Sequence, residues 1–254
     1  MDKGVTITGS RGFIGTKIRS LLNSMSIAYS EIDHSLGSDL KGISEQNGTL
    51  IHLAASIHED ESFRDPTKYI NNNINDLARI LMNNSFGKVI FPSSSSVYDP
   101  EGNLNPKSVY GITKLAGEFL IKIYCKNYWI LRITNPYGEG DRKSVFAELA
   151  RCKMDGNVFT IYRSDAKKNF FCVDHVIDVI SDILSGNIFC GVYNVGSNES
   201  YVVSDLLESI CKENNVRYEF VDPPKGLSSG YVPHENLLSE KKRSIGKEWK
   251  NYLL

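Results

Sequence analysis

The segment Thr8–Gly15, with the sequence TGSRGFIG, constrains the fold of this chain more than any other. An apolar stretch at residues 5–7 precedes it and predicts a short strand, and apolar residues recur at helical spacing after it. A strand, a glycine-rich turn and a helix in this order predict a dinucleotide-binding unit. Gly9 would make the tight turn, Gly12 would let the backbone approach a pyrophosphate, and Gly15 would let the helix pack on the strand.

Two charged residues bear on which dinucleotide would bind. Asp33 ends the second predicted strand, where a carboxylate accepts hydrogen bonds from the ribose hydroxyls of NAD. Arg11 lies inside the glycine loop and could instead pair with the 2′-phosphate of NADP. We therefore predict NAD as the cofactor, with NADP as the alternative because of Arg11.

The order of predicted elements indicates an α/β fold. Apolar runs predict strands at 28–32, 49–55, 89–91 and 128–133, and helical periodicity predicts helices at 67–85 and 110–126. Their alternation predicts a doubly wound parallel sheet. The rhythm changes after Gly138, so we predict a dinucleotide-binding domain at 1–136 plus 172–198 and a small substrate-binding lobe at 137–171 plus 199–254.

Charge and cysteine content exclude several classes of partner. A net charge of −1 gives no overall attraction for nucleic acid or for an anionic membrane, and no apolar run is long enough to cross a bilayer. The five cysteines are widely spaced and lack a CxxC pair, so we expect neither a disulfide framework nor a metal site. These features favour a cytoplasmic protein.

Tyr110 and Lys114 are the candidate catalytic pair. Four residues apart in a predicted helix, their side chains lie on one face one turn apart. The spacing arises by chance about once in a chain of this composition, so its position is what carries the inference. It follows a strand whose carboxyl end bears Ser93 to Ser96, where α/β sheets place their ligands. The lysine would favour the phenolate, and the tyrosine could exchange a proton with a sugar hydroxyl or ketone.

These motifs together resemble the extended short-chain dehydrogenase/reductase family, the NAD-dependent epimerases and dehydratases that act on nucleotide sugars. The resemblance covers nearly the whole chain and rests on these segments: TGSRGFIG, Asp33, Asp39-Leu40, HLAA at 52–55, Asn73-Ile74, SSSSVY, YGITK, LRITNPYG at 131–138, VDHV at 173–176 and YNVG at 193–196. It implies Ser94, Tyr110 and Lys114 as the catalytic residues. The implied cofactor contacts are Gly9, Arg11, Gly12, Phe13, Ile14, Gly15, Asp33, Asp39, Leu40, Leu53, Ala54, Ala55, Tyr110, Lys114 and Pro136.

Departures from the family pattern narrow the implied activity. Where the 4,6-dehydratases of the family carry an Asp and a Glu after the catalytic hydroxyl, this chain has Ser95 and Ser96, which lack comparable acidity. The resemblance then implies a 4-epimerase or 4-ketoreductase of a nucleotide-linked hexose that serves surface-polysaccharide precursor synthesis. We expect Ser95, Ser96, Asn135 and Lys168 on the substrate.

Two further expectations follow from the resemblance. The family pairs two helices across a dimer, so we expect a homodimer through the helices at 67–85 and 110–126. A non-catalytic nicotinamide-binding sensor or scaffold is the alternative function, because this fold can keep its cofactor and lose its chemistry.

Overall fold

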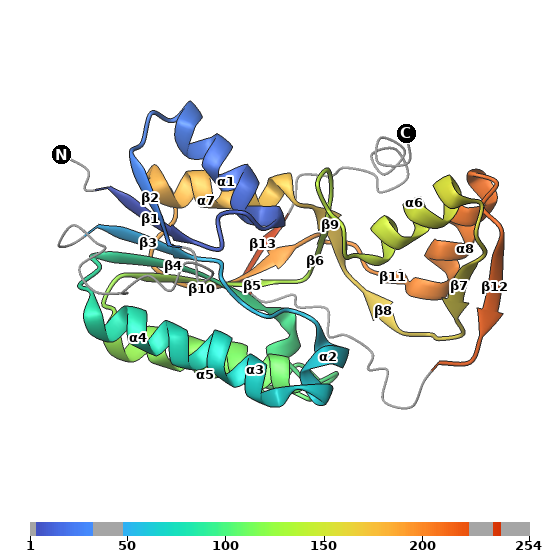
Figure 1. Ribbon diagram of the computed structural model, residues 1–254, viewed down its shortest axis with the longest axis horizontal. Coiled ribbons are helices and arrows are strands. Elements are labelled where there is room, and N and C mark those ends of the chain that lie inside the picture. Colours follow the sequence, from blue (N-terminus) through green and yellow to red (C-terminus); the bar gives the residue numbers. More distant parts are fainter. Residues whose placement is uncertain (1–3, 33–47, 224–235, 240–254) are drawn as a thin grey trace.

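A parallel sheet forms the centre of the molecule. The computed structural model describes residues 4–32, 48–223 and 236–239 (Figure 1). Within these residues the main sheet has seven strands in the order β13-β10-β5-β4-β3-β1-β2. Their bounds are β1 (Val5–Thr8), β2 (Tyr29–Ile32), β3 (Thr49–His52), β4 (Lys88–Ser94), β5 (Tyr128–Ile133), β10 (Gly191–Gly196) and β13 (Leu237–Ser239). Every neighbouring pair is parallel, which confirms the predicted doubly wound sheet.

The strand order reverses at β1. From β1 the chain moves outward to β2, and it then returns to place β3 on the other side of β1. Crevices at such a switch point, beyond the carboxyl ends of the strands, are where open α/β sheets bind ligands. The glycine loop follows β1 and the segment Leu53–Ala55 follows β3, so both lie at this point of the sheet.

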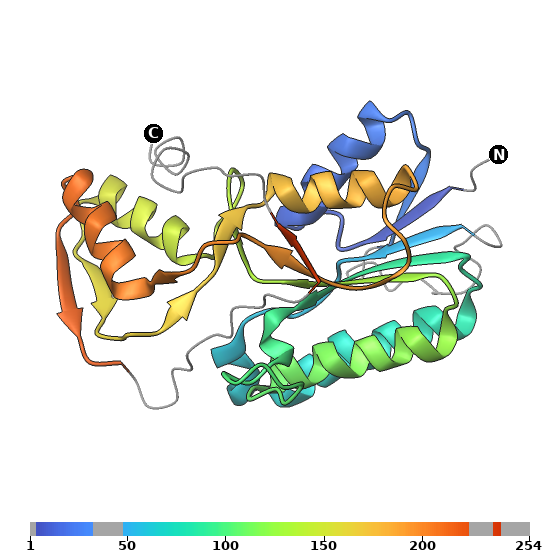
Figure 2. The ribbon, with the colours of Figure 1, turned by 180° about the vertical axis from the view of Figure 1, so that it is seen from behind.

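Helices cover both faces of the sheet. In Figures 1 and 2, α1 (Phe13–Ser24) and α7 (Asp174–Leu184) lie on one face, and α4 (Asp76–Asn83) and α5 (Val109–Tyr124) lie on the other. Successive side chains of a strand point to opposite faces of the sheet and so contribute to an apolar core on each face. In β4, Ile90 belongs to the core with α1 and α7, whereas Val89 and Phe91 belong to the core with α4. Burial on both faces explains why these strands are apolar throughout.

The predicted helix at 67–85 is not a single α-helix. It follows a short helix, α2 (Glu59–Arg64), and consists of α3 (Pro66–Ile70), a π-helical turn η2 (Asn71–Asn75) and α4. Asp65 caps its start, because its side chain accepts the backbone N–H of Lys68 at 3.0 Å. Apolar periodicity alone did not reveal the π-helical turn.

A second apolar core lies beside the main sheet. It is built on α6 (Val145–Asp155), α8 (Val203–Glu213) and two strand pairs, β7 (Phe159–Tyr162) with β12 (Tyr218–Val221) and β8 (Lys167–Lys168) with β11 (Tyr201–Val202). The buried side chains include Phe146, Phe159 and Leu207. A further pair, β6 (Asn135–Tyr137) with β9 (Phe170–Cys172), connects this part to the sheet (Figure 2).

The strand β13 corrects one detail of the predicted domain division. Leu237–Ser239 fall in the segment 199–254, which the sequence assigned to the small lobe, but they pair in parallel with β10 of the main sheet. Leu238 packs against the sheet core, which accounts for this placement. The remaining boundaries stay a prediction.

Candidate active site

Steric contacts require glycine at two of the three predicted glycine positions in the loop after β1. Gly9 has a φ of +68°, and a Cβ there would lie 2.7 Å from the backbone nitrogen of Ala54. A Cβ on Gly15 would overlap the Gly9 carbonyl oxygen and lie 2.8 Å from the Ser10 backbone. Gly12, the exposed N-cap of α1, differs, since a Cβ there would meet only the Gly9 oxygen, at 3.3 Å. Its missing side chain therefore leaves the outer side of the loop open to an approaching phosphate.

Thr8 joins this loop to the end of β3. The Leu53 N–H donates to the Thr8 carbonyl, and the Ala54 N–H donates to the Thr8 hydroxyl, both at 3.1 Å. The Nδ1 atom of His52 lies 2.9 Å from that hydroxyl. His52 is therefore a hydrogen-bonded packing residue, as its strand position indicated, while Leu53, Ala54 and Ala55 remain partly exposed at the switch point.

The other predicted cofactor residues divide into two groups. Arg11 is exposed, and Phe13, Ile14 and Pro136 are partly buried. Asp33, Asp39 and Leu40 lie outside the described residues. Of the two side chains that bear on the choice between NAD and NADP, Arg11 is therefore described and Asp33 is not.

The end of β4 brings Ser94 to Tyr110. Ser94 begins a 3₁₀ turn, η3 (Ser95–Val97), where its hydroxyl accepts the N–H of Ser96 at 3.1 Å. The same hydroxyl lies near enough to the phenol of Tyr110 to lower its pKa. Ser95 and Ser96 are partly exposed beside it. The predicted serine and tyrosine, sixteen positions apart in sequence, thus meet at the carboxyl edge of the sheet.

Helix α5 carries the other two predicted groups. Ser108 caps it by accepting the N–H of Gly111 at 3.0 Å. Tyr110 is 9% exposed and Lys114, one turn later, is 5% exposed. The Lys114 ammonium lies 4.4 Å from the centroid of the Phe91 ring, a cation–π contact that holds it against β4.

Burial dominates the protonation of both groups. It raises the pKa of Tyr110 to about 12, which the nearby Ser94 hydroxyl opposes and the charge of Glu59 reinforces. It lowers the pKa of Lys114 to about 8, which the charge of Glu118 opposes. The sequence suggested a phenolate favoured by Lys114, but Lys114 is not among the groups that shift the pKa of Tyr110, and burial of the phenol favours its protonated form.

Gly111 sets the contact between the two catalytic segments. A Cβ on it would overlap the carbonyl oxygen of Ser96 and lie 2.9 Å from Pro106. Only glycine therefore lets the 3₁₀ turn pack directly on the first turn of α5. This close approach keeps Ser94 within reach of Tyr110.

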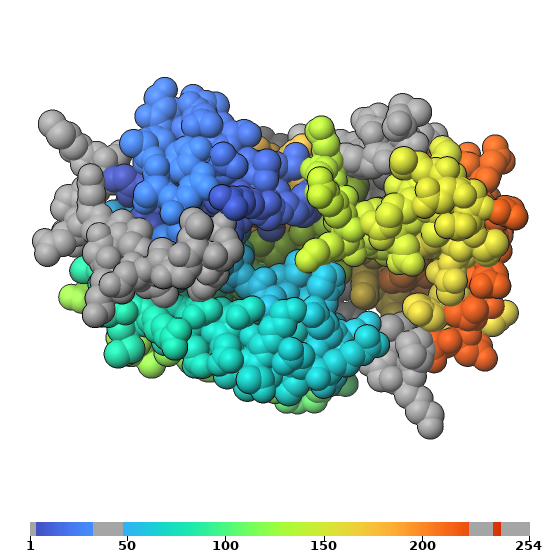
Figure 3. All heavy atoms as spheres, in the orientation of Figure 1, coloured from blue at the N-terminus to red at the C-terminus, as the bar shows by residue number. Residues whose placement is uncertain are grey.

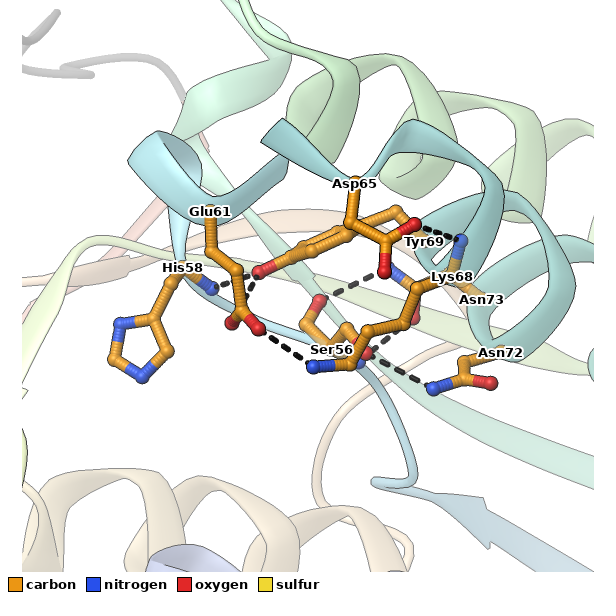
Figure 4. Close-up of polar contacts among 8 residues, drawn as sticks. All are labelled: Ser56, His58, Glu61, Asp65, Lys68, Tyr69, Asn72 and Asn73. Carbon is orange, nitrogen blue, oxygen red and sulfur yellow. Dashed lines mark hydrogen bonds and ion pairs between the residues drawn. The ribbon is translucent and has the colours of Figure 1, made fainter. Parts of the chain in front are cut away.

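Tyr69 in α3 packs against the ring of Tyr110. The two rings meet edge to face with centroids 6.5 Å apart, and Tyr69 is fully buried. Its hydroxyl accepts the His58 N–H at 3.0 Å and donates to Glu61 at 3.2 Å, as Figure 4 shows. Glu61 in turn pairs with Lys68 at 2.6 Å. The helical pattern of the sequence placed Tyr69 at an apolar position but did not predict its contact with Tyr110.

Asn73 connects the loop after β3 to α5. Its Oδ1 accepts the Ser56 N–H at 2.7 Å and its Nδ2 donates to the Ser56 carbonyl at 2.9 Å (Figure 4). The Nδ2 also donates to the Thr113 hydroxyl at 2.9 Å. Thr113 donates to the carbonyl of Tyr110 at 2.8 Å. Asn73 was one of the residues on which the resemblance rested. Its contacts with Ser56 and Thr113 depend on the π-helical turn, which the sequence did not predict.

A buried ionic network lies one turn beyond Lys114. Arg132 of β5 makes two contacts with Glu118 of α5, at 2.6 and 2.9 Å, and Glu118 has no exposed surface. Ser93 donates to the same carboxylate at 2.6 Å. Arg132 also donates to the Tyr98 hydroxyl at 2.8 Å, and that hydroxyl donates to Asn194 at 3.0 Å. The network ties four parts of the chain to the helix that carries the candidate pair.

The predicted substrate residues Asn135 and Lys168 lie at the junction with the small lobe. The Nδ2 atom of Asn135 donates to the carbonyl of Asn169 at 2.9 Å, so this side chain serves the backbone at least in part. Lys168 lies in β8 and is partly exposed. Asn169 binds Thr134 and Ser197, and a Cβ on Gly196 would lie 2.8 Å from the Thr134 hydroxyl. The sequence missed this packing role for Asn169.

The described residues contain no group of three His, Cys, Asp or Glu side chains that could hold a metal ion. Over the same residues, no helix is long and apolar enough to cross a membrane.

Comparison with known proteins identifies the family. The model of the NAD dependent epimerase/dehydratase family matches residues 5–196. The chain belongs to this family. The resemblance inferred from the sequence motifs is thereby confirmed.

The relatives of this chain within the epimerase/dehydratase family are named for different reactions. The chain is 25% identical to a dTDP-D-glucose 4,6-dehydratase from Dictyostelium discoideum, over 80% of this chain and 59% of that protein. It is 26% identical to a GDP-6-deoxy-D-mannose reductase from Pseudomonas aeruginosa, over 88% of this chain and 84% of that protein. The chain thus spans less than two thirds of the Dictyostelium protein.

A solved structure shows the same fold. The UDP-glucuronic acid 4-epimerase from Bacillus cereus superposes with a TM-score of 0.83 at 22% identity, covering 98% of each chain. Together with the family match, these relatives place the chain among nucleotide-sugar epimerases, dehydratases and reductases.

Proposed function

We propose that this chain catalyses an NAD-dependent redox reaction at the 4-position of a nucleotide-linked hexose, as a 4-epimerase or a 4-ketoreductase. The observation that supports the proposal is the position of Ser94 near Tyr110 at the carboxyl end of β4, with Lys114 buried one turn further along α5. We assign the activity to cytoplasmic synthesis of surface-polysaccharide precursors, as the resemblance implies.

The glycine loop fits a dinucleotide. Gly9 and Gly15 are required by the protein's own packing, whereas Gly12 leaves room on the outer side of the loop. The N–H groups of the first turn of α1 would hold the pyrophosphate there. NAD bound in this way would supply the hydride acceptor or donor for the sugar carbon.

The chain's own residues would handle the proton. Ser94 would hold the sugar oxygen, and Tyr110 would give a proton to it or take one from it. The ammonium of Lys114 would favour the phenolate that forms when Tyr110 gives up its proton. Because the pKa of Tyr110 is about 12, the phenol starts in the protonated form that a ketone requires.

Dehydration is not part of the proposal. That reaction needs an acid and a base at the carbon next to the ketone, and the serines at 95 and 96 supply neither. The 4,6-dehydratases among the relatives therefore suggest a shared fold and cofactor more than a shared reaction.

Replacement of Tyr110 tests the catalytic proposal. Tyr110→Phe should abolish turnover of the preferred sugar nucleotide and leave the affinity for NAD nearly unchanged, because the ring and its packing remain. Tyr162→Phe, an exposed tyrosine in β7, is the matched control and should keep full activity. A Tyr110→Phe protein with full activity would show that the phenol is not the proton donor, and cofactor-dependent partner binding without turnover would favour the sensor alternative.

A cofactor balance separates the two enzymes. UDP-, dTDP- and GDP-linked hexoses and their 4-keto forms are offered in turn while the absorbance of the reduced nicotinamide is followed. Stoichiometric consumption of the reduced cofactor indicates a ketoreductase. Interconversion of 4-epimers without net consumption indicates an epimerase.

We also propose a homodimer through α4 and α5. These helices lie side by side on one face of the sheet (Figure 1). On α5, Ile112, Phe119 and Ile123 form an apolar stripe and are 52%, 54% and 76% exposed. Ile123→Glu should therefore shift the sedimentation coefficient from dimer to monomer. Met154→Glu, equally exposed on α6 of the small lobe, should leave it unchanged. A monomeric wild-type protein would contradict the proposal.

A further inference from the structure

Glu59, the first residue of α2, lies against the helix that carries Tyr110. The Ser108 hydroxyl donates to the Glu59 carboxylate at 3.4 Å, and Ser108 is the cap of α5, two residues before Tyr110. The carbonyl of Glu59 accepts the buried Ser62 hydroxyl at 2.5 Å, which fixes its backbone. The carboxylate is therefore held beside the start of the catalytic helix, although the two segments are far apart in sequence.

Glu59 has no ion-pair partner among the described residues. Within the part of the chain that the structure describes, no lysine or arginine pairs with it. Glu61, two residues later, is different: it binds Lys68 and the Tyr69 hydroxyl and so supports the fold (Figure 4). Glu59 and Glu61 thus have separate roles, because of the two only Glu59 raises the pKa of Tyr110 through its charge.

An unpaired carboxylate next to the candidate proton donor constrains what can bind there. It accepts hydrogen bonds readily from sugar hydroxyls. It also repels any second anion brought to Tyr110, since like charges close together in a partly buried site are costly.

We propose that Glu59 determines the class of sugar, by accepting hydrogen bonds from a neutral hexose at Tyr110 and by excluding hexoses that carry a carboxylate. This inference rests on the proposed function, because it takes the sugar to be presented to Tyr110. The proposed selection by Glu59 is between neutral hexoses and uronic acids, and it applies to an epimerase and a ketoreductase alike.

The test compares two sugars that differ only in this charge. Affinities for UDP-glucose and UDP-glucuronic acid are measured by calorimetry with NAD present, in a Tyr110→Phe background where no turnover occurs. This protein should prefer UDP-glucose, and Glu59→Gln should reduce the preference by about tenfold or more. Asp60→Asn removes the same charge from the neighbouring exposed position and should leave the preference unchanged.

The outcomes separate the two proposals. Equal affinity for both sugars, binding of neither, or an unchanged preference in Glu59→Gln overturns the role of Glu59. A preference that depends on Glu59 in a protein whose unmodified form turns over no sugar nucleotide supports Glu59 and refutes the catalytic proposal. Turnover by the unmodified protein, combined with a sugar preference that does not depend on Glu59, supports the catalytic proposal and refutes the role of Glu59.

Discussion

Replacing Arg132 by Met should destabilise the protein severely. The substitution leaves the Glu118 carboxylate, which has no exposed surface, without its two contacts at 2.6 and 2.9 Å. Breaking a buried ion pair by removing one partner costs about 3–5 kcal/mol. Two hydrogen bonds to charged groups, at about 1.5–3 kcal/mol each, give a similar total. Since native proteins are stable by about 5–15 kcal/mol, the loss would be a large fraction of the free energy of unfolding.

A double variant separates the cost of an isolated charge from the cost of lost packing. Glu118→Leu with Arg132→Met removes both charges and should recover most of the stability, because apolar residues of similar volume replace buried ion pairs at little cost. Recovery should be incomplete, since Ser93 loses its acceptor at 2.6 Å, a penalty of about 1–3 kcal/mol.

Urea denaturation of the single and double variants measures these free energies. Arg163→Met is the control, because its ion pair with Asp222 is long, at 3.5 Å, and exposed, and its removal should have no measurable effect. The reasoning is refuted if Arg132→Met unfolds within about 1 kcal/mol of the wild type. It is equally refuted if the double variant is no more stable than the single one.

Three further predictions concern the same region. Gly111→Ala should lower kcat at least about tenfold, because its Cβ must displace the 3₁₀ turn that holds Ser94; unchanged steady-state kinetics would contradict the steric argument. Reduction of a 4-keto sugar should slow as the pH rises through about 8, where Lys114 loses the charge that favours the Tyr110 phenolate. A pH–rate profile of kcat/KM checks this, and Lys114→Arg, which stays charged, should move the decline to higher pH. Asn73→Ala should cost about 1–3 kcal/mol in urea denaturation by leaving buried partners unsatisfied, and a loss below that range would show that water replaces the amide.

Local patterns predicted much of the fold and the central residues of the candidate site. The glycine loop and the tyrosine–lysine pair are each set within one turn and one helix, so spacing alone places their side chains. The strands are fully apolar because both faces are buried, which made the parallel sheet predictable.

The residues that surround the candidate pair depended on long-range geometry. Glu59 meets Ser108 across 49 positions, and Arg132 reaches Glu118 from another element. Such contacts have no period or spacing in the sequence. The raised pKa of Tyr110 belongs to the same class, because burial depends on what packs over the ring. The strand at Leu237–Ser239 was missed because a three-residue strand has too few positions to show a pattern.

The π-helical turn η2 gives its helix one residue more than a regular α-helix would need, and this turn contains Asn73. A π turn holds one residue more than an α turn, and each residue of an α-helix advances the chain by about 100° around the axis. Deleting one of the three consecutive asparagines at 71–73 would restore a regular helix with no apolar residue lost. Because the π turn takes up its additional residue within one turn, the flanking side chains would stay nearly in register, and the loss would fall on the contacts of Asn73 with Ser56 and Thr113. The additional residue of the π turn therefore serves the site by placing Asn73 where it connects Ser56 to the catalytic helix.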